Sequence, residues 1–293
     1  MWISVVIPSL KRRDILHETV LSLARQSRPA DEILLSVVDP EQDLKAETLS
    51  VQGVRIVVGP QGSTFQRNTG IANLHPYCDL ISFLDDDVEL HPNYLRNGCE
   101  FMARHPEIVA ISDGGMIANG TPKGELSRSE AIRLVESARE DTSRRFQLRK
   151  GLYGCDMMVR RSVAEKTPFD TRLRYFALYE DMDFGARCAR LGLLAGYAGC
   201  QIVHLATQAS KCSARRYGYA HAMNGYYLWR KGSQSALSFF RTTTKALIAN
   251  VCGLVVTRRG VSRAQRWGRL RGSMLGFRDI VFHGAQPERI EYI

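Results

Sequence analysis

Short apolar runs alternate with amphipathic segments along the first ninety residues of the chain. The run ISVVIPSL at 3–10 is rich in β-branched residues and ends near a proline, which is typical of a buried strand. The next segment has apolar residues at helical spacing as far as Pro29, and a second helical pattern spans 63–74. Further strand-like runs lie at 31–40, 53–60 and 78–87. This order of elements predicts an α/β fold with a doubly wound, Rossmann-like mixed sheet.

The pattern changes beyond residue 111. Residues 112–150 are polar and glycine-rich, and they predict a loop and a helix without a domain break. After them the pattern predicts a strand at 151–163, a helix at 179–192 and a strand of the same sheet at 193–205. From about residue 210 the pattern is helical and basic. We therefore expect one α/β domain at 1–209 and a basic, amphipathic, helical C-terminal extension at 210–293.

The composition is that of a folded protein and not of a disordered one. The chain has 293 residues, of which 44% are hydrophobic and 24% charged. Its seven cysteines include no C-x-x-C pair, which indicates reduced thiols in a cytoplasmic protein and argues against cysteine-bound metal. The most apolar long stretch, 246–256, is too short for a membrane-spanning helix. The N-terminus lacks a basic segment before its apolar run, so it predicts a strand and not a signal peptide.

The net charge of +10 is unevenly distributed along the chain. Residues 1–204 contain 25 Lys and Arg against 27 Asp and Glu, whereas residues 205–293 contain 15 against 3. The last third is therefore strongly basic, with apolar residues between the charges. This asymmetry predicts a surface for an anionic lipid, a polyanion or a phosphate-bearing substrate.

Three consecutive carboxylates, Asp85, Asp86 and Asp87, follow an apolar strand. In an extended strand Asp85 and Asp87 would point to one side and Asp86 to the other. Two carboxylates beside a sheet edge predict a site for a hard divalent cation, Mg²⁺ or Mn²⁺, which would bridge them to the phosphates of a nucleotide. The alternative is a solvated turn with helix-capping aspartates. Asp39 and Gly59 also end predicted strands, and ligands of doubly wound sheets bind at that edge.

Other polar residues are candidates for the same site. Glu180 and Asp181 begin a predicted helix, either as helix caps or as a general base whose ionised form the helix dipole stabilises. Arg67 and Asn68 follow a glycine-containing loop, where an arginine can contact phosphate, but they are equally consistent with a surface residue and a cap. His204 ends a predicted strand, either as a packed histidine or as a further metal ligand.

Together and in this order, these segments resemble the family 2 glycosyltransferases, which have the GT-A fold and transfer sugars with inversion. The opening strand, helix and strand at 4–39, the Gly-x-x-x-x-Arg-Asn-x-Gly segment at 62–70 and the D-x-D segment ISFLDDDVELHPNYL are similar to the family's motifs. So are the segment at 168–192, which carries Glu-Asp, and GCQIVHL, which carries His204. The resemblance covers roughly residues 3–205.

The resemblance implies a donor-binding role for four of the candidates. Pro8 and Asp39 would border the donor base, with the Asp39 carboxylate accepting from the N3–H of uracil or thymine. Arg67 and Asn68 would lie at the nucleotide pocket. The family often ends its second strand with two acidic residues and Gly-Ser, whereas here Asp39 is followed by Pro40. This difference leaves the identity of the nucleotide open.

The resemblance also implies a metal site. Asp85 and Asp87 would hold Mg²⁺ or Mn²⁺ on the diphosphate of the donor, and Asp86 would lie near the donor ribose or sugar. His204 would complete the metal shell, as it does in some members of the family. The metal would stabilise the charge that develops on the leaving nucleoside diphosphate.

The remaining implied roles concern the acceptor. Asp181, supported by Glu180, would be the base that takes a proton from the acceptor hydroxyl. The implied donor is a UDP- or dTDP-linked sugar, and the implied acceptor is a glycan or a lipid-linked precursor in polysaccharide biosynthesis. The implied location is cytoplasmic, peripheral on the cytoplasmic face of the inner membrane.

The basic C-terminal extension is consistent with such a membrane-associated position. The segments SARRYGYAHAMNGYYLWRKGS and RRGVSRAQRWGRLRGSMLGFRD interleave arginine with apolar and aromatic residues, as helices on anionic membranes do. Positive charge alone also suits nucleic acid. Because the resembling enzymes often act on lipid-linked acceptors, we expect a membrane and no nucleic-acid partner. The alternative is a solvated helical face with homo-oligomer contacts.

Three rival functions fit parts of the sequence. FLDDDVE also resembles haloacid-dehalogenase-type phosphatases, with Asp85 as nucleophile and Asp87 as acid/base, but that family usually places the motif near the start of its core domain. A nucleotidyltransferase would usually show a glycine-rich loop after the first strand, and PSLKRRD has no glycine. The third rival is a catalytically inactive GT-A-like binding or scaffold protein, against which the presence of all the expected carboxylates argues.

Overall fold

The computed structural model describes residues 1–121, 124–139, 145–207, 212–255 and 261–293. The chain forms two compact units. Unit 1 comprises Met1–Phe169 and Phe184–Ser210, and unit 2 comprises Asp170–Asp183 and Lys211–Ile293. A segment from the middle of the chain therefore belongs with the C-terminal helices. The single boundary at residue 209 stays a prediction, because that residue lies outside the described ranges.

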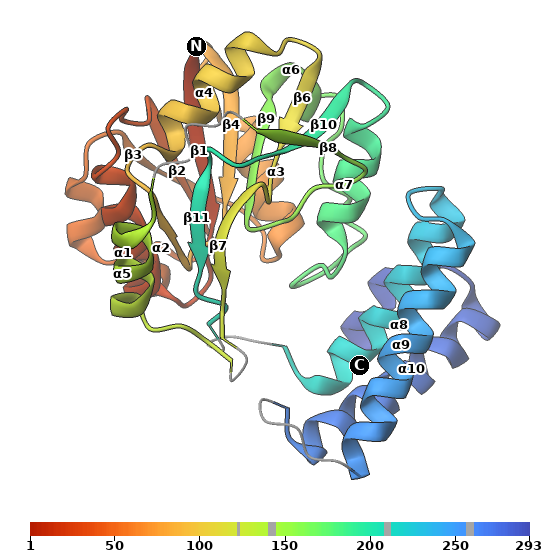
Figure 1. Cartoon of the computed structure of the whole chain (residues 1–293). Helices are drawn as coiled ribbons and strands as arrows, with labels where there is room; N and C mark the ends of the chain where they lie inside the picture. The colour runs from red at the N-terminus through yellow and green to blue at the C-terminus, as the bar shows by residue number, and fades with distance from the viewer. Residues whose placement is uncertain (122–123, 140–144, 208–211, 256–260) are drawn as a thin grey trace. The chain divides into compact units, whose positions relative to one another are not determined.

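The centre of unit 1 is a mixed sheet with the strand order β3-β2-β1-β4-β9-β6-β10-β8 (Figure 1). Its strands are β1 (Trp2–Pro8), β2 (Glu32–Val37), β3 (Val54–Val58), β4 (Cys78–Leu84), β6 (Ile108–Ile111), β8 (Phe146–Arg149), β9 (Asp156–Arg160) and β10 (Leu193–Tyr197). The first four run parallel, whereas β9 and β8 are antiparallel to their neighbours. The carboxyl ends of β1, β2 and β4 therefore meet at one edge of the sheet.

The helices of unit 1 connect these strands. They are α1 (Arg13–Ala24), α2 (Pro40–Asp43), α3 (Ser63–Ala72), α4 (Tyr94–Arg104), α5 (Arg128–Ser137) and α6 (Arg161–Ala164), with the 3-10 helix η1 (Ala46–Ser50). A further helix, α7 (Glu180–Cys188), begins in unit 2 and ends in unit 1. The predicted helices after the first and third strands are present as α1 and α3. α1 ends at Ala24, well before the proline that was expected to stop it.

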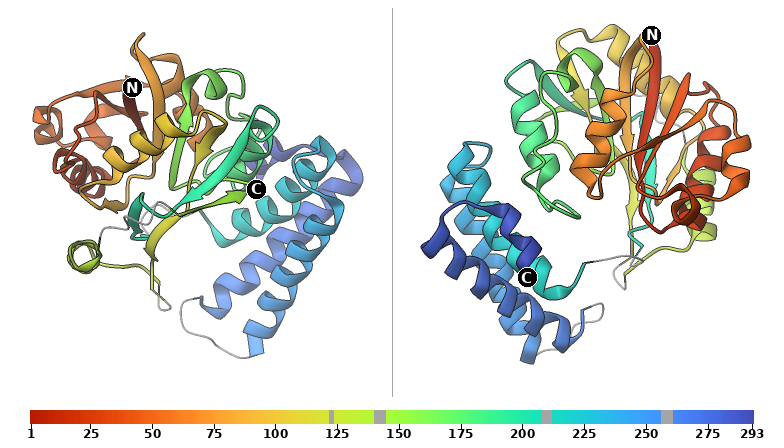
Figure 2. Two further views of the ribbon diagram at one scale, coloured as in Figure 1. Left: turned by 45° about the horizontal axis from the view of Figure 1, so that its top comes forward. Right: turned by 180° about the vertical axis from the view of Figure 1, so that it is seen from behind.

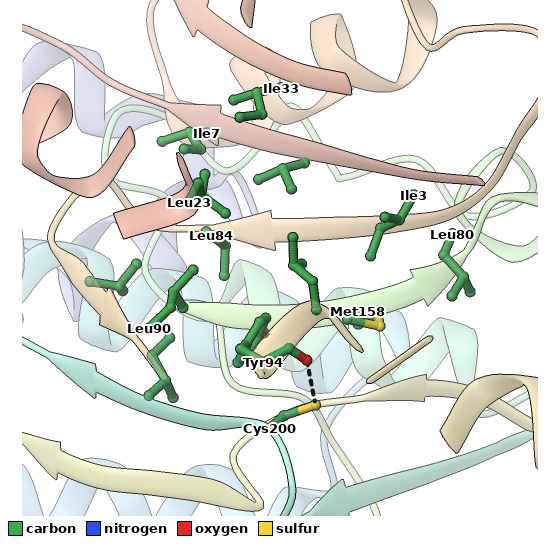
Figure 3. Packing of buried hydrophobic residues seen from close by; sticks show 14 of the residues in the cluster. Ile3, Ile7, Leu23, Ile33, Leu80, Leu84, Leu90, Tyr94, Met158 and Cys200 are labelled. Carbon is green, nitrogen blue, oxygen red and sulfur yellow. Dashed lines mark hydrogen bonds between the residues drawn. The ribbon is translucent and has the colours of Figure 1, made fainter. Parts of the chain in front are cut away.

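Side chains of β1 pack into two apolar cores on opposite faces of the sheet. Ile3, Val5 and Ile7 belong to a cluster with side chains of α1 and α4, and Figure 3 shows this packing. Val6 belongs to a second cluster with side chains of α3, α6 and α7. Because successive strand side chains alternate in direction, a strand buried on both faces has the continuous apolar run seen in the sequence. Helices on both faces confirm the doubly wound architecture.

A smaller sheet in unit 1 has the order β5-β11-β7. β11 (Gln201–His204) is antiparallel to β5 (Val88–Leu90) and parallel to β7 (Gly115–Asn119). The prediction of one strand at 193–205 is therefore wrong, and His204 ends a strand of the smaller sheet. The chain turns after β10 at Gly199, where a Cβ would lie 2.6 Å from the ring of Tyr197. Glycine thus permits the tight turn that separates the two strands.

The prediction of only a loop and a helix at 112–150 is also wrong. The helix is present as α5, but β7 and β8 lie on either side of it. β7 is partly exposed and β8 is exposed along its whole length. Strands without a buried face lack the apolar periodicity from which a strand is predicted.

Unit 2 consists of helices together with residues 170–183. The helices are α8 (Ala214–Lys231), α9 (Ala236–Val255), α10 (Arg263–His283) and the 3-10 helix η2 (Pro287–Tyr292), which confirms the helical prediction (Figure 2). α8 and α10 pack closely, since a Cβ at Gly218 or Gly272 would lie 1.9 Å from a backbone oxygen of the other helix. In the described part of the chain, no helix has both the length and the apolar character needed to cross a membrane.

Candidate active site

The three consecutive aspartates lie in a turn that connects β4 to β5. β4 ends at Leu84, opposite Asp156, the first residue of β9. The assumption that residues 85–87 extend the strand is therefore wrong, because the ladder with β9 ends before them.

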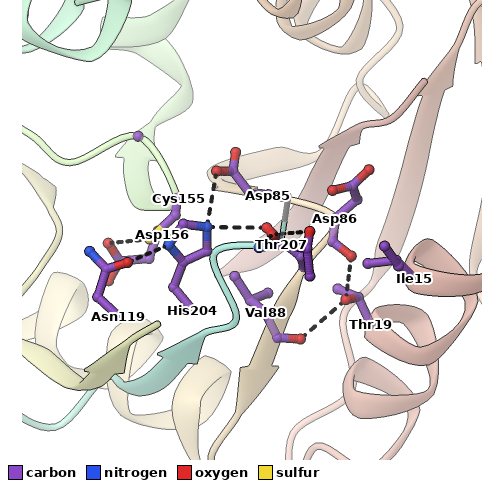
Figure 4. A network of polar contacts seen from close by, with 12 residues as sticks. Ile15, Thr19, Asp85, Asp86, Val88, Asn119, Cys155, Asp156, His204 and Thr207 are labelled. Atoms are coloured by element: carbon purple, nitrogen blue, oxygen red, sulfur yellow. Dashed lines mark hydrogen bonds and ion pairs between the residues drawn. The ribbon is translucent and has the colours of Figure 1, made fainter. Parts of the chain in front are cut away.

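Asp85 and Asp86 nevertheless point in different directions (Figure 4). Asp85 and Asp87 face the imidazole of His204, with carboxylate oxygens 3.9 and 3.1 Å from its Nε2. Asp86 points instead to Arg12, in the loop after β1, with 2.7 Å between Oδ1 and Nη1. Two carboxylates and one imidazole therefore converge on one point, and the third carboxylate lies apart from it.

Arg67 of α3 supplies a buried positive charge to this turn. Its side chain is 2% exposed, and Nη2 lies 2.9 Å from Asp85 Oδ1 and donates to the carbonyl oxygen of Gly154. The guanidinium also lies 5.4 Å from the centre of the Phe169 ring. Burial raises the pKa of Asp85, although the charges of Arg67 and His204 oppose that rise. Arg67 is thus not the surface residue of the alternative interpretation.

Arg12 bridges the other two carboxylates. Its Nη2 lies 3.0 Å from Asp87 Oδ2, an oxygen that also accepts from the backbone N–H and the hydroxyl of Thr207. Asp86 accepts a hydrogen bond from Ser9 Oγ at 2.7 Å. Burial raises the pKa of Asp86 against the attraction of Arg12, whereas hydrogen bonds and nearby positive charges outweigh burial and lower the pKa of Asp87. Paired guanidinium groups therefore make three adjacent carboxylates tolerable at the end of a buried strand.

His204 is oriented by Asn119, the residue opposite it on β7. The Asn119 amide nitrogen donates to Tyr153 Oη at 2.7 Å, so its amide oxygen faces His204 Nδ1 at 2.8 Å. An amide oxygen only accepts, so Nδ1 carries the proton and the lone pair of the neutral ring lies on Nε2. Burial lowers the pKa of His204, but the hydrogen bond and charge of Asp87 and the charge of Asp85 outweigh it and raise the pKa.

Asp85, Asp87 and His204 form a set of ligand atoms that can hold a metal ion. One ligand atom from each lies within 4.8 Å of the others. The donor set suits Mg²⁺ or Mn²⁺, because two carboxylate oxygens supply negative charge and the imidazole presents a lone pair. The oriented imidazole is the arrangement usual for a metal-bound histidine.

Asp156 is a further carboxylate near this cluster, and the sequence analysis missed it (Figure 4). Its side chain is buried, and both of its oxygens face the backbone N–H of Asp113, at 3.1 and 3.2 Å. Burial raises the pKa of Asp156 well above its ordinary value. A signal was available, because Asp156 is a charged residue at the start of an apolar run, just as Asp85 stands at the end of one.

The other residues predicted on α3 have structural partners in unit 1. Asn68 Nδ2 donates to the carbonyl oxygen of Phe169, and Asn68 Oδ1 accepts from the N–H of Phe169, both at 2.8 Å. Its predicted contact with a nucleotide stays a prediction. Gly70 lets α3 approach β1, since a Cβ there would lie 2.4 Å from Val6 Cγ1. The helix that carries Arg67 is thereby held close to the sheet.

The residues predicted to border the donor base lie at the ends of β1 and β2. Pro8 ends β1, and Asp39 caps α2, with Oδ1 accepting from the N–H of Glu41 at 3.0 Å. The buried carboxylate of Asp43 accepts backbone N–H groups from both loops, including those of Lys11 and Asp39. A cavity of about 500 Å³ lies beside these loops and is lined by Lys11, Arg12, Arg13, Asp14, Ile15, Glu41 and Gln42. Base binding by Asp39 stays a prediction.

Glu180 and Asp181 begin α7 and belong to unit 2. Glu180 is buried and Asp181 is partly exposed, with Asp181 Oδ1 accepting from the N–H of Met182 at 2.8 Å. Both lie at the positive end of the helix, where an ionised carboxylate is stabilised. Their catalytic roles stay predictions.

Several residues of the site carry no local signal that separates them from ordinary polar residues. Ser9 and Arg12 are part of a loop whose basic run KRR was visible, but their partners lie more than seventy residues away. Asn119 lies in the segment predicted as a loop and a helix, and Thr207 lies between the strand predicted at 193–205 and the predicted C-terminal helices. Their contacts with His204 and Asp87 depend on the smaller sheet, which the sequence analysis did not anticipate.

Residues 4–167, more than half of the chain, match the family described as glycosyl transferase family 2. The chain belongs to glycosyltransferase family 2. This membership confirms the resemblance noted from the sequence and supports glycosyl transfer as its chemistry. The haloacid-dehalogenase and nucleotidyltransferase interpretations therefore find no support. A comparison with curated protein sequences gave no match.

Solved structures share the fold of this family 2 glycosyltransferase. The crystal structure of S. aureus TarS residues 1–349 matches with a TM-score of 0.56 and 13% identity, over 100% of this chain and 83% of that one. The crystal structure of S. aureus TarS matches with a TM-score of 0.52 and 14% identity, over 100% of this chain and 50% of that one. At this identity the likeness concerns the fold alone, and it confirms the predicted GT-A fold with a helical C-terminal region.

Proposed function

We propose that this family 2 glycosyltransferase is metal-dependent and inverting, and that it uses a UDP- or dTDP-linked sugar. Its proposed acceptor is a glycan or a lipid-linked precursor of a surface polysaccharide. The observation that carries the proposal is the convergence of Asp85, Asp87 and His204 at the edge of the sheet. This donor set suits Mn²⁺ or Mg²⁺, and such a cation binds the diphosphate of a nucleotide sugar.

In the proposed reaction the acceptor oxygen forms a bond to the anomeric carbon of the donor sugar. The bond from that carbon to the diphosphate oxygen breaks, and the nucleoside diphosphate leaves with the electron pair. Asp181, supported by Glu180, takes the proton of the acceptor hydroxyl. A metal ion held by Asp85, Asp87 and His204 would supply positive charge to the leaving diphosphate.

The described residues around the turn at 85–87 favour metal binding there. Arg12 and Arg67 pair with carboxylate oxygens that do not face His204, so they hold the turn without occupying the point of convergence. Their charge also favours the ionised form of the carboxylates, which is the form that binds metal. Asn119 keeps the Nε2 lone pair of His204 available.

Thermal melting with and without Mn²⁺, in the presence of UDP, dTDP or GDP, tests the donor site. A ligand at 100 times its Kd stabilises the folded state by about 2.7 kcal/mol, so we expect a metal-dependent shift with one nucleotide. Asp87→Asn should lose this shift. Asp181→Asn should keep the shift and lose sugar transfer, which separates donor binding from the chemical step. Absence of a shift with every nucleotide would contradict the proposal.

An inactive binding or scaffold protein is the second candidate. The observation that favours it is the pairing of Arg12 and Arg67 with all three aspartates, which offsets two of the three carboxylate charges without a metal. Donor hydrolysis and transfer assays distinguish the two functions. Nucleotide binding without hydrolysis or transfer would favour the second candidate.

We also propose that unit 2 docks on an anionic membrane at the cytoplasmic face. The exposed side of α10 carries large apolar side chains at intervals of about two turns, with arginines between them. These apolar residues are Trp267, Met274, Val281 and Phe282, and the arginines are Arg271 and Arg278. The exposed apolar residues Ile248, Val251 and Val255 lie on the last turns of α9. This pattern suits insertion among anionic headgroups.

A membrane explains this surface better than a second copy of the chain. A symmetric dimer through this face of α10 would place Arg271 and Arg278 of the two copies against each other. Repulsion between these like charges would destabilise the dimer. Flotation with vesicles of phosphatidylglycerol or of phosphatidylcholine tests the proposal. We expect binding to the anionic vesicles alone, reduced in an Arg271→Glu variant. A concentration-dependent dimer that does not bind vesicles would favour the oligomer contact, and binding to RNA in place of vesicles would favour nucleic acid.

A further inference from the structure

The segment that carries Glu180 and Asp181 folds together with the C-terminal helices. Residues Asp170–Asp183 belong to the same compact unit as α8, α9, α10 and η2. Leu173 and Ala177 of the segment are buried in one apolar cluster with Tyr227 and Leu228 of α8. The helices therefore supply the core on which this segment packs.

An ion triad centred on Lys231 joins the two ends of the segment. Lys231, the last residue of α8, places Nζ 2.6 Å from a carboxylate oxygen of Asp170 and 2.9 Å from the carboxylate of Asp183. Asp170 precedes Asp181 in the segment, and Asp183 follows it by half a turn of α7. One cation thus ties both flanks of the proposed base to α8.

Both carboxylates have a second donor from the same helix or the turn after it. Tyr227 Oη donates to Asp170 at 2.7 Å, and Ser233 Oγ donates to Asp183 at 2.6 Å. The Asp183 side chain has no exposed surface, whereas Lys231 is 25% exposed. Because a buried carboxylate needs charged or hydrogen-bonding partners, Asp183 is held at this place by Lys231 and Ser233.

The backbone of the segment is also held in an unusual conformation. Tyr175, Ala177 and Tyr179 have positive φ values of 58°, 45° and 74°, a region that residues other than glycine seldom adopt. Asn224 of α8 donates to the carbonyl oxygen of Leu178, between two of them, at 2.9 Å. Such conformations persist only where the surrounding contacts impose them. The contacts with α8 therefore determine how the chain enters α7.

We propose that Lys231 is a positioning residue, which orients Asp181 for proton transfer by bridging Asp170 and Asp183. The proposal rests on the proposed function, in which Asp181 is the base. It assigns the C-terminal helices a part in the chemical step, in addition to any role on a membrane. A small displacement of a reacting group slows the chemical step. We therefore expect loss of the Lys231 bridge to lower kcat, the rate at which the bound complex reacts.

Lys231→Met removes the bridging charge and tests this assignment. We expect kcat for sugar transfer to fall by about 10- to 100-fold. The KM for the donor and the metal-dependent melting shift with nucleotide should stay unchanged, because the donor ligands belong to unit 1. Hydrogen exchange should become faster in residues 173–182. Lys231→Arg, whose guanidinium can still bridge two carboxylates, should recover most of kcat.

Lys245→Met is the matched control, because it is the same substitution at an exposed position of α9 in unit 2. It should change neither kcat nor hydrogen exchange in the segment. If Lys231→Met does not fold, Ser233→Ala replaces it, since this change removes one hydrogen bond to Asp183 and leaves the triad. We then expect a smaller fall in kcat, again at constant donor KM.

The outcomes separate this inference from the proposed function. Transfer by the wild type, loss of transfer in Asp181→Asn and an unchanged kcat in folded Lys231→Met would overturn the role of Lys231 alone. A fall in melting temperature with unchanged kcat per folded molecule would show that the triad is only structural. Full activity of Asp181→Asn, or a wild type that transfers no sugar, would overturn the base assignment and this inference with it.

Discussion

His204 and Asn119 lie directly opposite each other on the parallel strands β11 and β7, and a hydrogen bond of 2.8 Å joins their side chains. The bond determines which ring nitrogen of His204 faces Asp85 and Asp87. Neither strand was recognised as part of a common sheet from the sequence. The availability of the imidazole as a ligand therefore depends on a strand pairing and not on a motif.

Asn119→Ala should weaken Mn²⁺ binding by about tenfold, because residues that orient a metal-bound histidine typically contribute 10- to 100-fold to affinity. The measurement is a titration of the nucleotide-dependent melting shift with Mn²⁺. Asn119→Asp keeps an oxygen acceptor for Nδ1 and should retain most of the affinity. Equal Mn²⁺ affinity in Asn119→Ala and the wild type would contradict the ligand role of His204.

Arg67→Met should lower the free energy of unfolding by about 3 kcal/mol, the scale for removing one partner of a buried ion pair. The guanidinium is 2% exposed and pairs with Asp85, which is 34% exposed, so water compensates part of the loss. Urea unfolding followed by circular dichroism measures the change. Arg104→Met breaks the exposed pair with Glu100 on α4 and should cost less than about 1 kcal/mol. Similar costs for both variants would show that burial of Arg67 is unimportant.

Gly70→Ala should destabilise the fold by about 1–3 kcal/mol, the usual cost of overpacking a core. The added methyl would lie 2.4 Å from Val6 Cγ1, so α3 would have to move away from β1. Gly151→Ala is the control, because a Cβ there meets no atom within 4 Å. The urea midpoints of the two variants give the comparison, and an unchanged midpoint in Gly70→Ala would refute the close packing of α3 on β1.

The thiols should react in two groups with Ellman's reagent at pH 8. Cys252 is exposed and Cys212 partly exposed, whereas the other five cysteines are buried. Burial raises the pKa of Cys99 to about 11 and that of Cys155 well above its ordinary value, which keeps these buried thiols protonated and unreactive. We expect Cys252→Ser to remove the fastest phase and urea to expose the remaining five. Fast reaction of more than two thiols in the folded protein would contradict this.

Much of the larger sheet could be predicted, because the burial of its strands is visible in the pattern of apolar residues along the sequence. β1, β2 and β4 are buried on both faces and therefore have continuous apolar runs. The aspartates that follow β4 were recognisable as candidate metal ligands from their residue type and position. β8 was missed because it is exposed along its length, and the change of sheet after β10 was missed because a glycine turn interrupts an otherwise apolar run.

The sequence by itself determined the family, the order of the main elements, and the choice of Asp85, Asp87 and His204 as candidate metal ligands. Only the tertiary structure decided that Arg12 and Arg67 pair with the aspartates, that Asn119 orients His204, and that the segment with Asp181 folds on the C-terminal helices. The physical reason is the range of the interactions. Apolar periodicity and strand-end residues act within one element, whereas each of these pairings joins residues far apart in the chain. Such contacts exist only once strand pairing and helix packing have brought the elements together.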